Sequence, residues 1–213
     1  ANGKQADRLD CEWGKAIQPD MLWDALKKKH YESIAIVHNE TSTGVENPVE
    51  ALCQVIREIS PDTIIMVDAV SSLGGVKIEM DKLGIDFLLT SSQKCIALPP
   101  GLSLAGTSDR ALKKAESVEN RGWYFDLLLM EKHRLKDSTP MTPVLPLIYA
   151  LDFQLERIFT EGLEARFQRH TAMSQKVYSW MESHDLKPYP ADNCRSRTVA
   201  TINNDKNWAI GDL

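Results

Sequence analysis

The sequence lacks the features that mark metal, disulfide-bonded or membrane proteins. Its four cysteines, Cys11, Cys53, Cys95 and Cys194, are widely separated and form no C-x-x-C pair, which argues against a zinc site and a disulfide framework. The five histidines show no metal-ligand spacing. No apolar run approaches the roughly 20 residues that a membrane-spanning helix needs. The sequence therefore predicts no metal site, no membrane segment and a reducing compartment.

Other absences concern partners and organisation. The net charge of -5 gives no reason to expect nucleic acid or an anionic membrane surface, and the basic run Lys27–Lys29 is expected to be a solvated helix end. There are no internal repeats or low-complexity tracts. The strand-Asp pattern TIIMVD is also found in P-loop proteins, but no G-x-x-x-x-G-K-[ST] motif accompanies it. With 43% hydrophobic and 26% charged residues, the chain can bury a core of one domain, or one and a part.

Both ends of the sequence resemble cuts. The chain begins at ANGKQ without an initiator methionine and stops at NWAIGDL, which is typical of the first turn of a helix beginning at Trp208. We expect an internal fragment of a longer subunit. Cytoplasmic localisation is expected, and an unseen N-terminus leaves organellar targeting open.

Hydrophobic periodicity and cap signals divide the chain into alternating strands and helices. Ser108 is the expected N-cap of one helix, and Gly162 marks a break between two others, so we place a domain boundary near Glu161. The alternation predicts an α/β fold with a mostly parallel sheet flanked by helices. Strands are predicted at 6–13, 33–38, 63–68, 86–91, 102–108 and 197–204, and helices at 18–29, 48–60, 80–84, 109–118, 144–159 and 162–183.

One aromatic cluster allows two interpretations. Trp123, Tyr124 and Phe125 precede the apolar run DLLLM. They could belong to the core or form a stripe against another subunit, and the sequence favours the core.

An aspartate and a lysine follow two neighbouring strands in the middle of the sequence. Asp68 closes the strand at 63–68, and Lys94 follows the strand at 86–91. The short helical turn between them, stopped by Gly84, makes these strands parallel neighbours. Because the carboxyl ends of such strands line the ligand crevice of an open sheet, the carboxylate and the amine are expected to face one pocket.

This pair has the chemistry that pyridoxal phosphate requires. A neutral lysine amine attacks an aldehyde to form a Schiff base, and a carboxylate beside the ring nitrogen keeps the ring an electron sink. The spacing of the two residues is not selective by itself. On Asp68 and Lys94 alone, a surface lysine and a loop-capping aspartate would be the simpler interpretation.

The motifs around this pair carry more information. HNETSTGVENP, VDAVSSLGG, GIDFLLTSSQKCIALPPGLSLA and STPMTPVLPLIYAL occur in this order along the chain. Together they resemble the class V aminotransferase family of fold type I pyridoxal-phosphate enzymes, in particular its alanine–glyoxylate and serine–glyoxylate (serine–pyruvate) branch. The resemblance covers nearly the whole chain. It implies that residues 1–161 are part of the large cofactor-binding domain and that 162–213 begin a small α+β C-terminal domain.

The resemblance also implies roles for individual residues. Lys94 would be the Schiff-base lysine and proton shuttle, and Asp68 would pair with the pyridine nitrogen. Val70 would pack on the ring and Gln93 would reach the phosphate. The remaining two cofactor-binding residues are Thr41, on the ring-hydroxyl or substrate side, and Thr142, which would reach the phosphate of a neighbouring subunit.

The activity implied by the resemblance is a ping-pong transamination. The amino group would move from a small amino acid, alanine or serine, to a 2-oxo acid such as glyoxylate or pyruvate. Thr142 implies a homodimer with a shared active site. The identities of donor and acceptor stay open, because the residues that select them are expected outside this chain.

The sequence departs from the family pattern at several places. Thr139 stands where relatives often carry an aromatic phosphate ligand. The upstream phosphate loop, the ring-stacking aromatic and the substrate-carboxylate arginine have no counterpart, since Arg195 and Arg197 lie in a different context. The 213 residues alone are therefore expected to bind the cofactor weakly or not at all.

Two alternatives remain beside the transaminase. A cysteine desulfurase or related lyase would usually have a histidine before the lysine, so Gln93 favours transamination, and Cys95 is expected to be a packed residue. A catalytically silent subunit of a complex is the other alternative, and the presence of both Asp68 and Lys94 argues against it.

Overall fold

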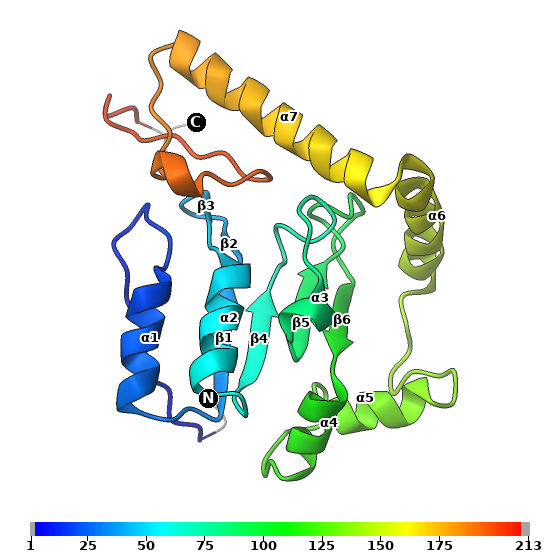
Figure 1. The fold of residues 1–213 in the computed structure, drawn as a ribbon. Helices are drawn as coiled ribbons and strands as arrows, with labels where there is room; N and C mark the ends of the chain where they lie inside the picture. Colours follow the sequence, from blue (N-terminus) through cyan, green and yellow to red (C-terminus); the bar gives the residue numbers. More distant parts are fainter. Residues whose placement is uncertain (1–2, 210–213) are drawn as a thin grey trace.

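The computed structural model describes residues 3–209, which fold around a four-stranded sheet (Figure 1). The strand order is β1-β4-β5-β6, with β1, β4 and β5 parallel. The predicted α/β class with a mostly parallel sheet is confirmed. The strands are β1 (Ser33–Val37), β4 (Ile64–Asp68), β5 (Phe87–Ser91) and β6 (Ser103–Thr107), and a separate antiparallel pair is formed by β2 (Asn39–Glu40) and β3 (Val45–Glu46).

Strand β6 runs antiparallel to its neighbour β5, with Leu89 opposite Ala105. The connection between these two strands is a turn at residues 92–102 that contains no helix. A parallel arrangement needs a crossover of a dozen or more residues, so this short connection brings the chain back beside β5 in the opposite direction.

Helices surround the sheet at positions close to those predicted. Pro19 occupies the first turn of α1, and the Ser108 hydroxyl accepts a hydrogen bond from the Ala111 amide at the start of α4, as the cap signal predicted. Gly162, with φ of 85°, separates α6 from α7. The helices are α1 (Pro19–Lys28), α2 (Val49–Ile59), α3 (Met80–Leu83), α4 (Asp109–Glu116), α5 (Leu127–Arg134), α6 (Leu145–Glu161) and α7 (Leu163–Ser183), with a 3-10 turn η1 (Asp192–Cys194).

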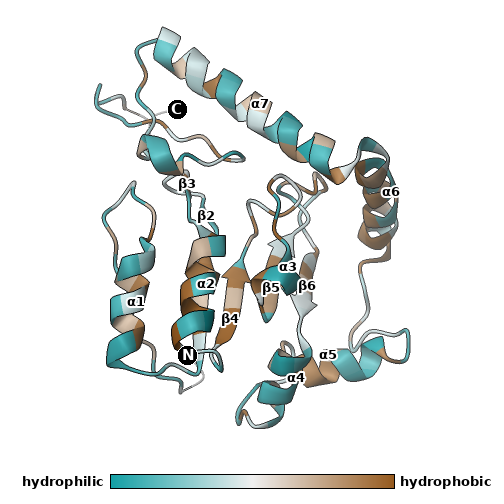
Figure 2. Cartoon of the chain, viewed as in Figure 1, coloured by the Kyte–Doolittle hydropathy of each residue, from teal (hydrophilic) through white to brown (hydrophobic). Residues whose placement is uncertain are grey.

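The main core lies between α1, α2 and the strands β1, β4 and β5. Helix α2 buries Val49, Leu52, Cys53 and Ile56, which recur at the spacing of one helical face. These residues pack with Leu22 and Leu26 of α1 and with the apolar residues of the three parallel strands. Strand β4 is apolar along nearly its whole length, as expected for a central parallel strand covered on both sides (Figure 2).

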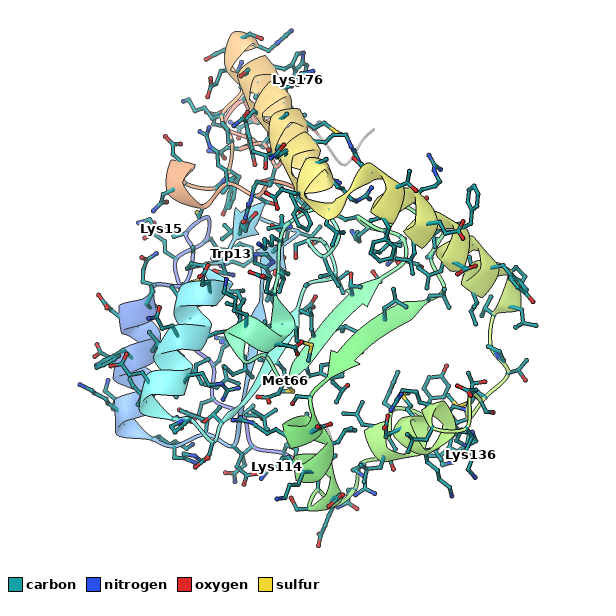
Figure 3. All side chains as sticks on the ribbon, turned by 45° about the vertical axis from the view of Figure 1, so that its right-hand side comes forward. Trp13, Lys15, Met66, Lys114, Lys136 and Lys176 are labelled. Atoms are coloured by element: carbon teal, nitrogen blue, oxygen red, sulfur yellow. The ribbon has the colours of Figure 1, made fainter. Side chains whose placement is uncertain are left out.

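The chain after α7 returns to the β2–β3 pair. Tyr178 donates a hydrogen bond to the carbonyl of Ser196 at 3.0 Å, and the Thr201 hydroxyl donates to the carbonyl of Thr43 at 2.7 Å. Near η1, the Ala191 amide donates to the Gly14 carbonyl at 2.8 Å, which places the loop around Trp13 and Lys15 beside this turn (Figure 3). The C-terminal segment is therefore hydrogen-bonded to the loops around Gly14 and Thr43.

Two predicted strands are wrong. Residues 6–13 and 197–204 were predicted to be strands, but neither forms a strand in the described chain. Residues 6–13 are exposed, and Asp7 instead accepts hydrogen bonds from Lys29 and Tyr31. The segment 197–204 makes one isolated bridge, from Ile202 to Pro188, because its other polar groups bond to loops instead of a neighbouring strand.

The aromatic cluster is not part of the core. Trp123, Tyr124 and Phe125 are 62%, 57% and 79% exposed, so the interpretation favoured by the sequence is wrong. The short helix α5, which was not predicted, follows them and is capped by Asp126. The cluster stands out from the fold because no described element covers it.

The remaining fold predictions concern the C-terminal end and the membrane. Trp208 and Ala209 are not helical, and the rest of the predicted helix lies outside the described residues. The domain boundary near Glu161 coincides with the break between α6 and α7 and stays a prediction. None of the described helices is long and apolar enough to cross a membrane.

Candidate active site

The carboxyl ends of the three parallel strands meet at one edge of the sheet. Val37 pairs with Asp68 across β1 and β4, and Asp68 pairs with Leu89 across β4 and β5. Asp68 is the last residue of β4, and Lys94 lies in the turn that directly follows β5. Both side chains are exposed. The predicted placement of the acid and the amine at adjacent strand ends is present in the fold. Figure 1 shows the two strands, β4 and β5, side by side.

The backbone after β4 folds around the Asp68 carboxylate. Its Oδ1 accepts a hydrogen bond from the Val70 amide at 2.9 Å. The Ala69 amide donates to the Leu89 carbonyl at 2.9 Å, and the Thr90 hydroxyl donates to the Ala69 carbonyl at 3.3 Å. These contacts fix the half-buried Val70 next to Asp68 and join the end of β4 to β5.

The turn that carries Lys94 is held by hydrogen bonds at several points. The Leu98 amide donates to the Ser92 carbonyl at 2.9 Å, and the Ser92 hydroxyl donates to the Pro99 carbonyl at 2.7 Å. Ala97 has φ of 61°, a left-handed conformation that costs a residue with a Cβ about 1–2 kcal/mol. A turn that keeps this conformation is fixed by its surroundings, so Lys94 starts from a defined backbone position.

Ser71 connects the loops around the site. Its hydroxyl accepts hydrogen bonds from the Thr41 hydroxyl and from Nδ2 of the Asn39 side chain, both at 3.1 Å. Its carbonyl accepts from the Thr198 hydroxyl at 2.7 Å and from the Cys95 thiol at 3.5 Å. The loop after Asp68 is therefore bonded to the loop that contains Thr41 and to the residue that follows Lys94.

The six predicted site residues are not all brought together. Asp68, Val70 and Thr41 are linked through the loop after β4, and Gln93 is exposed next to Lys94. Thr142 is exposed in the segment before α6, and no hydrogen bond in the described chain connects it to the other five. Its predicted role concerns a neighbouring subunit, so it stays a prediction.

Lys94 also borders a cavity of about 390 Å³ on the side of α6 and α7. Its other described walls come from the Lys94 turn and from these two helices, so Asp68 lies outside it. The cavity includes three arginines, Arg157, Arg166 and Arg169, and its one acidic residue is Glu161. Lys94 thus lines a basic cavity that Asp68 does not line, and a pocket shared by the two side chains stays a prediction.

Two buried polar atoms near the strand ends have no hydrogen-bond partner within the described chain. They are Oδ1 of Asn39, the first residue of β2, and Oγ of Ser91, the last residue of β5. An unpaired buried polar group costs about 1–3 kcal/mol, so each of these atoms favours a further hydrogen-bond partner. Their position agrees with a ligand site at this edge of the sheet.

Sequence reasoning missed the residues that hold the site in place. Ser71 and Thr198 make the hydrogen bonds just described, and Arg166 contacts the backbone beside Lys94. Small polar residues in the loop VSSLGG signalled a turn but not its partners. These contacts join residues that are far apart in the sequence, as in the 127 residues between Ser71 and Thr198.

Comparison with known proteins identifies the fold. The model of the family described as aminotransferase class-V matches residues 3–209. The chain belongs to this family. A serine–glyoxylate aminotransferase of Methylorubrum extorquens is 35% identical over 184 residues, covering 83% of this chain and 46% of the relative. An uncharacterized aminotransferase of Methanocaldococcus jannaschii is 36% identical over 200 residues, covering 92% of this chain and 51% of the relative.

Solved aminotransferase structures agree with the fold described above. An aspartate aminotransferase from Thermus thermophilus superposes with a TM-score of 0.85 at 28% identity, covering 96% of this chain and 56% of that one. An alanine–glyoxylate aminotransferase from Nostoc sp. gives a TM-score of 0.83 at 33% identity, covering 89% of this chain and 51% of that one. The predicted family and fold are confirmed. The chain spans about half the length of the curated relatives it matches.

Proposed function

We propose that the full-length protein containing this chain is a pyridoxal-phosphate-dependent aminotransferase. It would transfer the amino group of a small amino acid, alanine or serine, to a 2-oxo acid such as glyoxylate or pyruvate. The observation that carries the proposal is the placement of Lys94 and Asp68 at the ends of adjacent strands in a class-V chain. Relatives named serine–glyoxylate and alanine–glyoxylate aminotransferases support the substrate class.

The residues present fit the aldehyde and pyridine ends of the cofactor. Pyridoxal phosphate supplies an aldehyde that condenses with amines and a ring that accepts electrons from the substrate Cα. Lys94 offers the amine, and its Nζ would take the proton from the substrate Cα and deliver it to the cofactor's C4′ carbon. The Asp68 carboxylate would accept the hydrogen bond of the protonated ring nitrogen. Val70 would pack on the ring, with Gln93 and Thr41 at the phosphate and the ring hydroxyl.

The direct test is transamination by the full-length protein and its Lys94→Ala variant. General acid–base catalysis contributes about 10²–10⁴-fold, so loss of the amine should lower the rate by at least that factor. Lys82→Ala is the matched control, because Lys82 is an exposed lysine on α3 that pairs with Glu79. Its rate should stay within about twofold of the wild-type rate. A Lys94→Ala protein with more than about a tenth of the wild-type rate would contradict the proposal.

The same assay separates the proposed activity from cysteine desulfuration. Cys95 lies beside Lys94, but burial raises the pKa of its thiol and its Sγ donates to the Ser71 carbonyl. A thiol with a raised pKa is a poor nucleophile at neutral pH. Incubation with cysteine should therefore release no sulfide above the level of the Lys94→Ala protein. Lysine-dependent sulfide release would favour the desulfurase instead.

A second candidate function is favoured by one relative. A protein of Synechococcus named as the small subunit of a soluble hydrogenase is 35% identical and covers 95% of this chain and 53% of its own. This name favours a subunit of a larger complex. Purification of the full-length protein with transaminase activity and without further subunits would exclude this candidate.

We further propose that the protein is cytoplasmic and forms a homodimer whose active sites are shared. Support for a subunit contact comes from large apolar side chains that are exposed on the described chain. Trp123, Tyr124 and Phe125 are exposed before α5, and Tyr149 and Phe153 of α6 are 73% and 62% exposed. Figure 2 shows that α6 is largely apolar although it stands away from the sheet.

A further inference from the structure

Arg166 of α7 contacts both loops that carry the candidate site. This arginine is only 6% exposed. Its Nε donates a hydrogen bond to the Gly74 carbonyl at 2.7 Å, and its Nη2 donates to the Cys95 carbonyl at 2.5 Å. Gly74 lies in the loop that joins Asp68 to α3, and Cys95 directly follows Lys94. One side chain therefore bridges two segments that lie 92 and 71 residues away from it in the sequence.

The charge of this buried guanidinium is compensated. Nη1 of Arg166 donates to the Glu161 carboxylate at 3.0 Å, and Nη2 of Arg169 donates to the same carboxylate at 2.9 Å. The hydrogen bond from Arg169 is the largest effect and lowers the pKa of Glu161, and the hydrogen bond from Arg166 lowers it further. Burial acts in the opposite direction, and the resulting pKa is about 2. Glu161 is therefore ionised at neutral pH, and its carboxylate compensates the charge of Arg166. The other hydrogen bonds of Arg166 go to the two backbone carbonyls.

The contacts of Arg166 depend on the shape of its side chain as well as its charge. Three nitrogens of one planar group point to three different partners. A lysine carries a single ammonium on a flexible stem and cannot reproduce this fork. The thiol of Cys95, which donates to Ser71 at 3.5 Å, also joins the two loops, but a thiol is a weak donor.

We propose that Arg166 is a positioning residue that holds the Lys94 turn against the loop after Asp68. The consequence for catalysis rests on the proposed function, because the separation of the amine and the acid matters only when both act on one ligand. A displacement of about 1 Å in a catalytic group can cost about 10²-fold in rate. Arg166 would affect the rate by fixing the position of Lys94, without contacting the ligand itself.

The mechanical part of the proposal is tested on the cofactor-free full-length protein. The rate at which a maleimide modifies Cys95 is measured by peptide mass spectrometry in the wild type and in Arg166→Gln, Arg166→Lys and Arg169→Gln. Cys95 should react about tenfold faster in both Arg166 variants, because the turn opens locally. In Arg169→Gln, which shares Glu161 but bonds neither carbonyl, the rate should stay within about twofold. Cys53, 1% exposed in the core, should stay unmodified in all four proteins.

Two results would overturn the proposal. The first is an unchanged Cys95 rate in Arg166→Gln while Cys53 stays protected. The second is parallel modification of Cys95 and Cys53, which would mean that Arg166 supports the whole fold and not this turn.

The catalytic part is tested by reductive attachment of pyridoxal phosphate to Lys94. Half-maximal attachment should need about tenfold more cofactor in both Arg166 variants and an unchanged concentration in Arg169→Gln. Equal concentrations in all proteins would contradict the positioning role. If the wild type attaches no cofactor at Lys94, the proposed function fails, while the maleimide result still decides the mechanical part.

Discussion

The most demanding prediction concerns Asp86, a buried carboxylate that joins α2, β4, β5 and α4. Asp86 is 2% exposed and accepts hydrogen bonds from the Ile65 amide at 2.9 Å, from Arg57 at 2.7 Å and from Ser108 at 2.8 Å. Arg110 adds a contact at 3.2 Å. The change Asp86→Asn keeps the shape but removes the charge that compensates these groups. We expect the fold to lose stability without losing its architecture.

The size of the loss follows from the burial of the partners. Removing one partner of a fully buried ion pair costs about 3–5 kcal/mol. The side chains of Arg57 and Arg110 are 24% and 46% exposed, so water screens part of the charge that is left. We therefore expect Asp86→Asn to lower the free energy of unfolding by about 2–3 kcal/mol at pH 7.

The pH dependence of the stability provides a second test of this prediction. Burial alone raises the pKa of Asp86, but the hydrogen bonds from Ile65, Arg57 and Ser108 and the charge of Arg110 outweigh it and lower the pKa. A carboxyl whose pKa is lowered on folding stabilises the protein above its unfolded pKa of about 3.9, and this contribution is lost as the pH falls through the folded pKa. The difference between wild type and Asp86→Asn should shrink in acid.

Urea unfolding of the full-length protein, followed by circular dichroism at several pH values, measures both effects. Glu79→Gln is the control, because Glu79 forms exposed pairs with Lys77 and Lys82 and its loss should leave the stability nearly unchanged. A loss below about 0.5 kcal/mol for Asp86→Asn, or a loss that does not depend on pH, would refute the reasoning.

Three further changes test other parts of the account. Ser108→Ala removes the α4 cap and one hydrogen bond to Asp86, so it should lower the free energy of unfolding in urea by about 1–2 kcal/mol. The loss should be smaller in the Asp86→Asn background, and fully additive losses would contradict the coupling of Ser108 to Asp86. Leu52→Ala should lower the free energy of unfolding by about 2–5 kcal/mol, because Leu52 is completely buried. Leu135→Ala, at a residue 69% exposed, should lower it little, and equal losses would contradict the location of the core. Phe125→Ser should weaken the proposed homodimer in sedimentation of the full-length protein, and an unaffected dimer would place the interface elsewhere.

Local sequence signals predicted most of the elements that position the site. The apolar run ending at Asp68 predicted β4, because such a run reports a buried strand, and the start signal Asn47-Pro48 predicted the helix that became α2. Ser108 and Gly162 marked helix ends through capping and backbone freedom. The order of strands and helices was enough to place Asp68 and Lys94 at neighbouring strand ends.

Features set by distant contacts could not be predicted in the same way. Residues 197–204 have the composition of a strand, but Thr198 and Thr201 bond to the loops at Ser71 and Thr43 instead. The exposure of Trp123 and its neighbours depends on what covers them, which a hydropathy pattern does not contain. Arg166 carries no motif, and its contacts became visible only when the fold brought its partners together.

The central claim is that Lys94 covalently holds pyridoxal phosphate opposite Asp68. Borohydride reduction of the full-length protein loaded with the cofactor, followed by peptide mapping, tests it most directly. The account predicts a single stably labelled lysine, Lys94, and much weaker labelling in Asp68→Ala. A label on a different lysine, or no retained cofactor in the wild type, would contradict it.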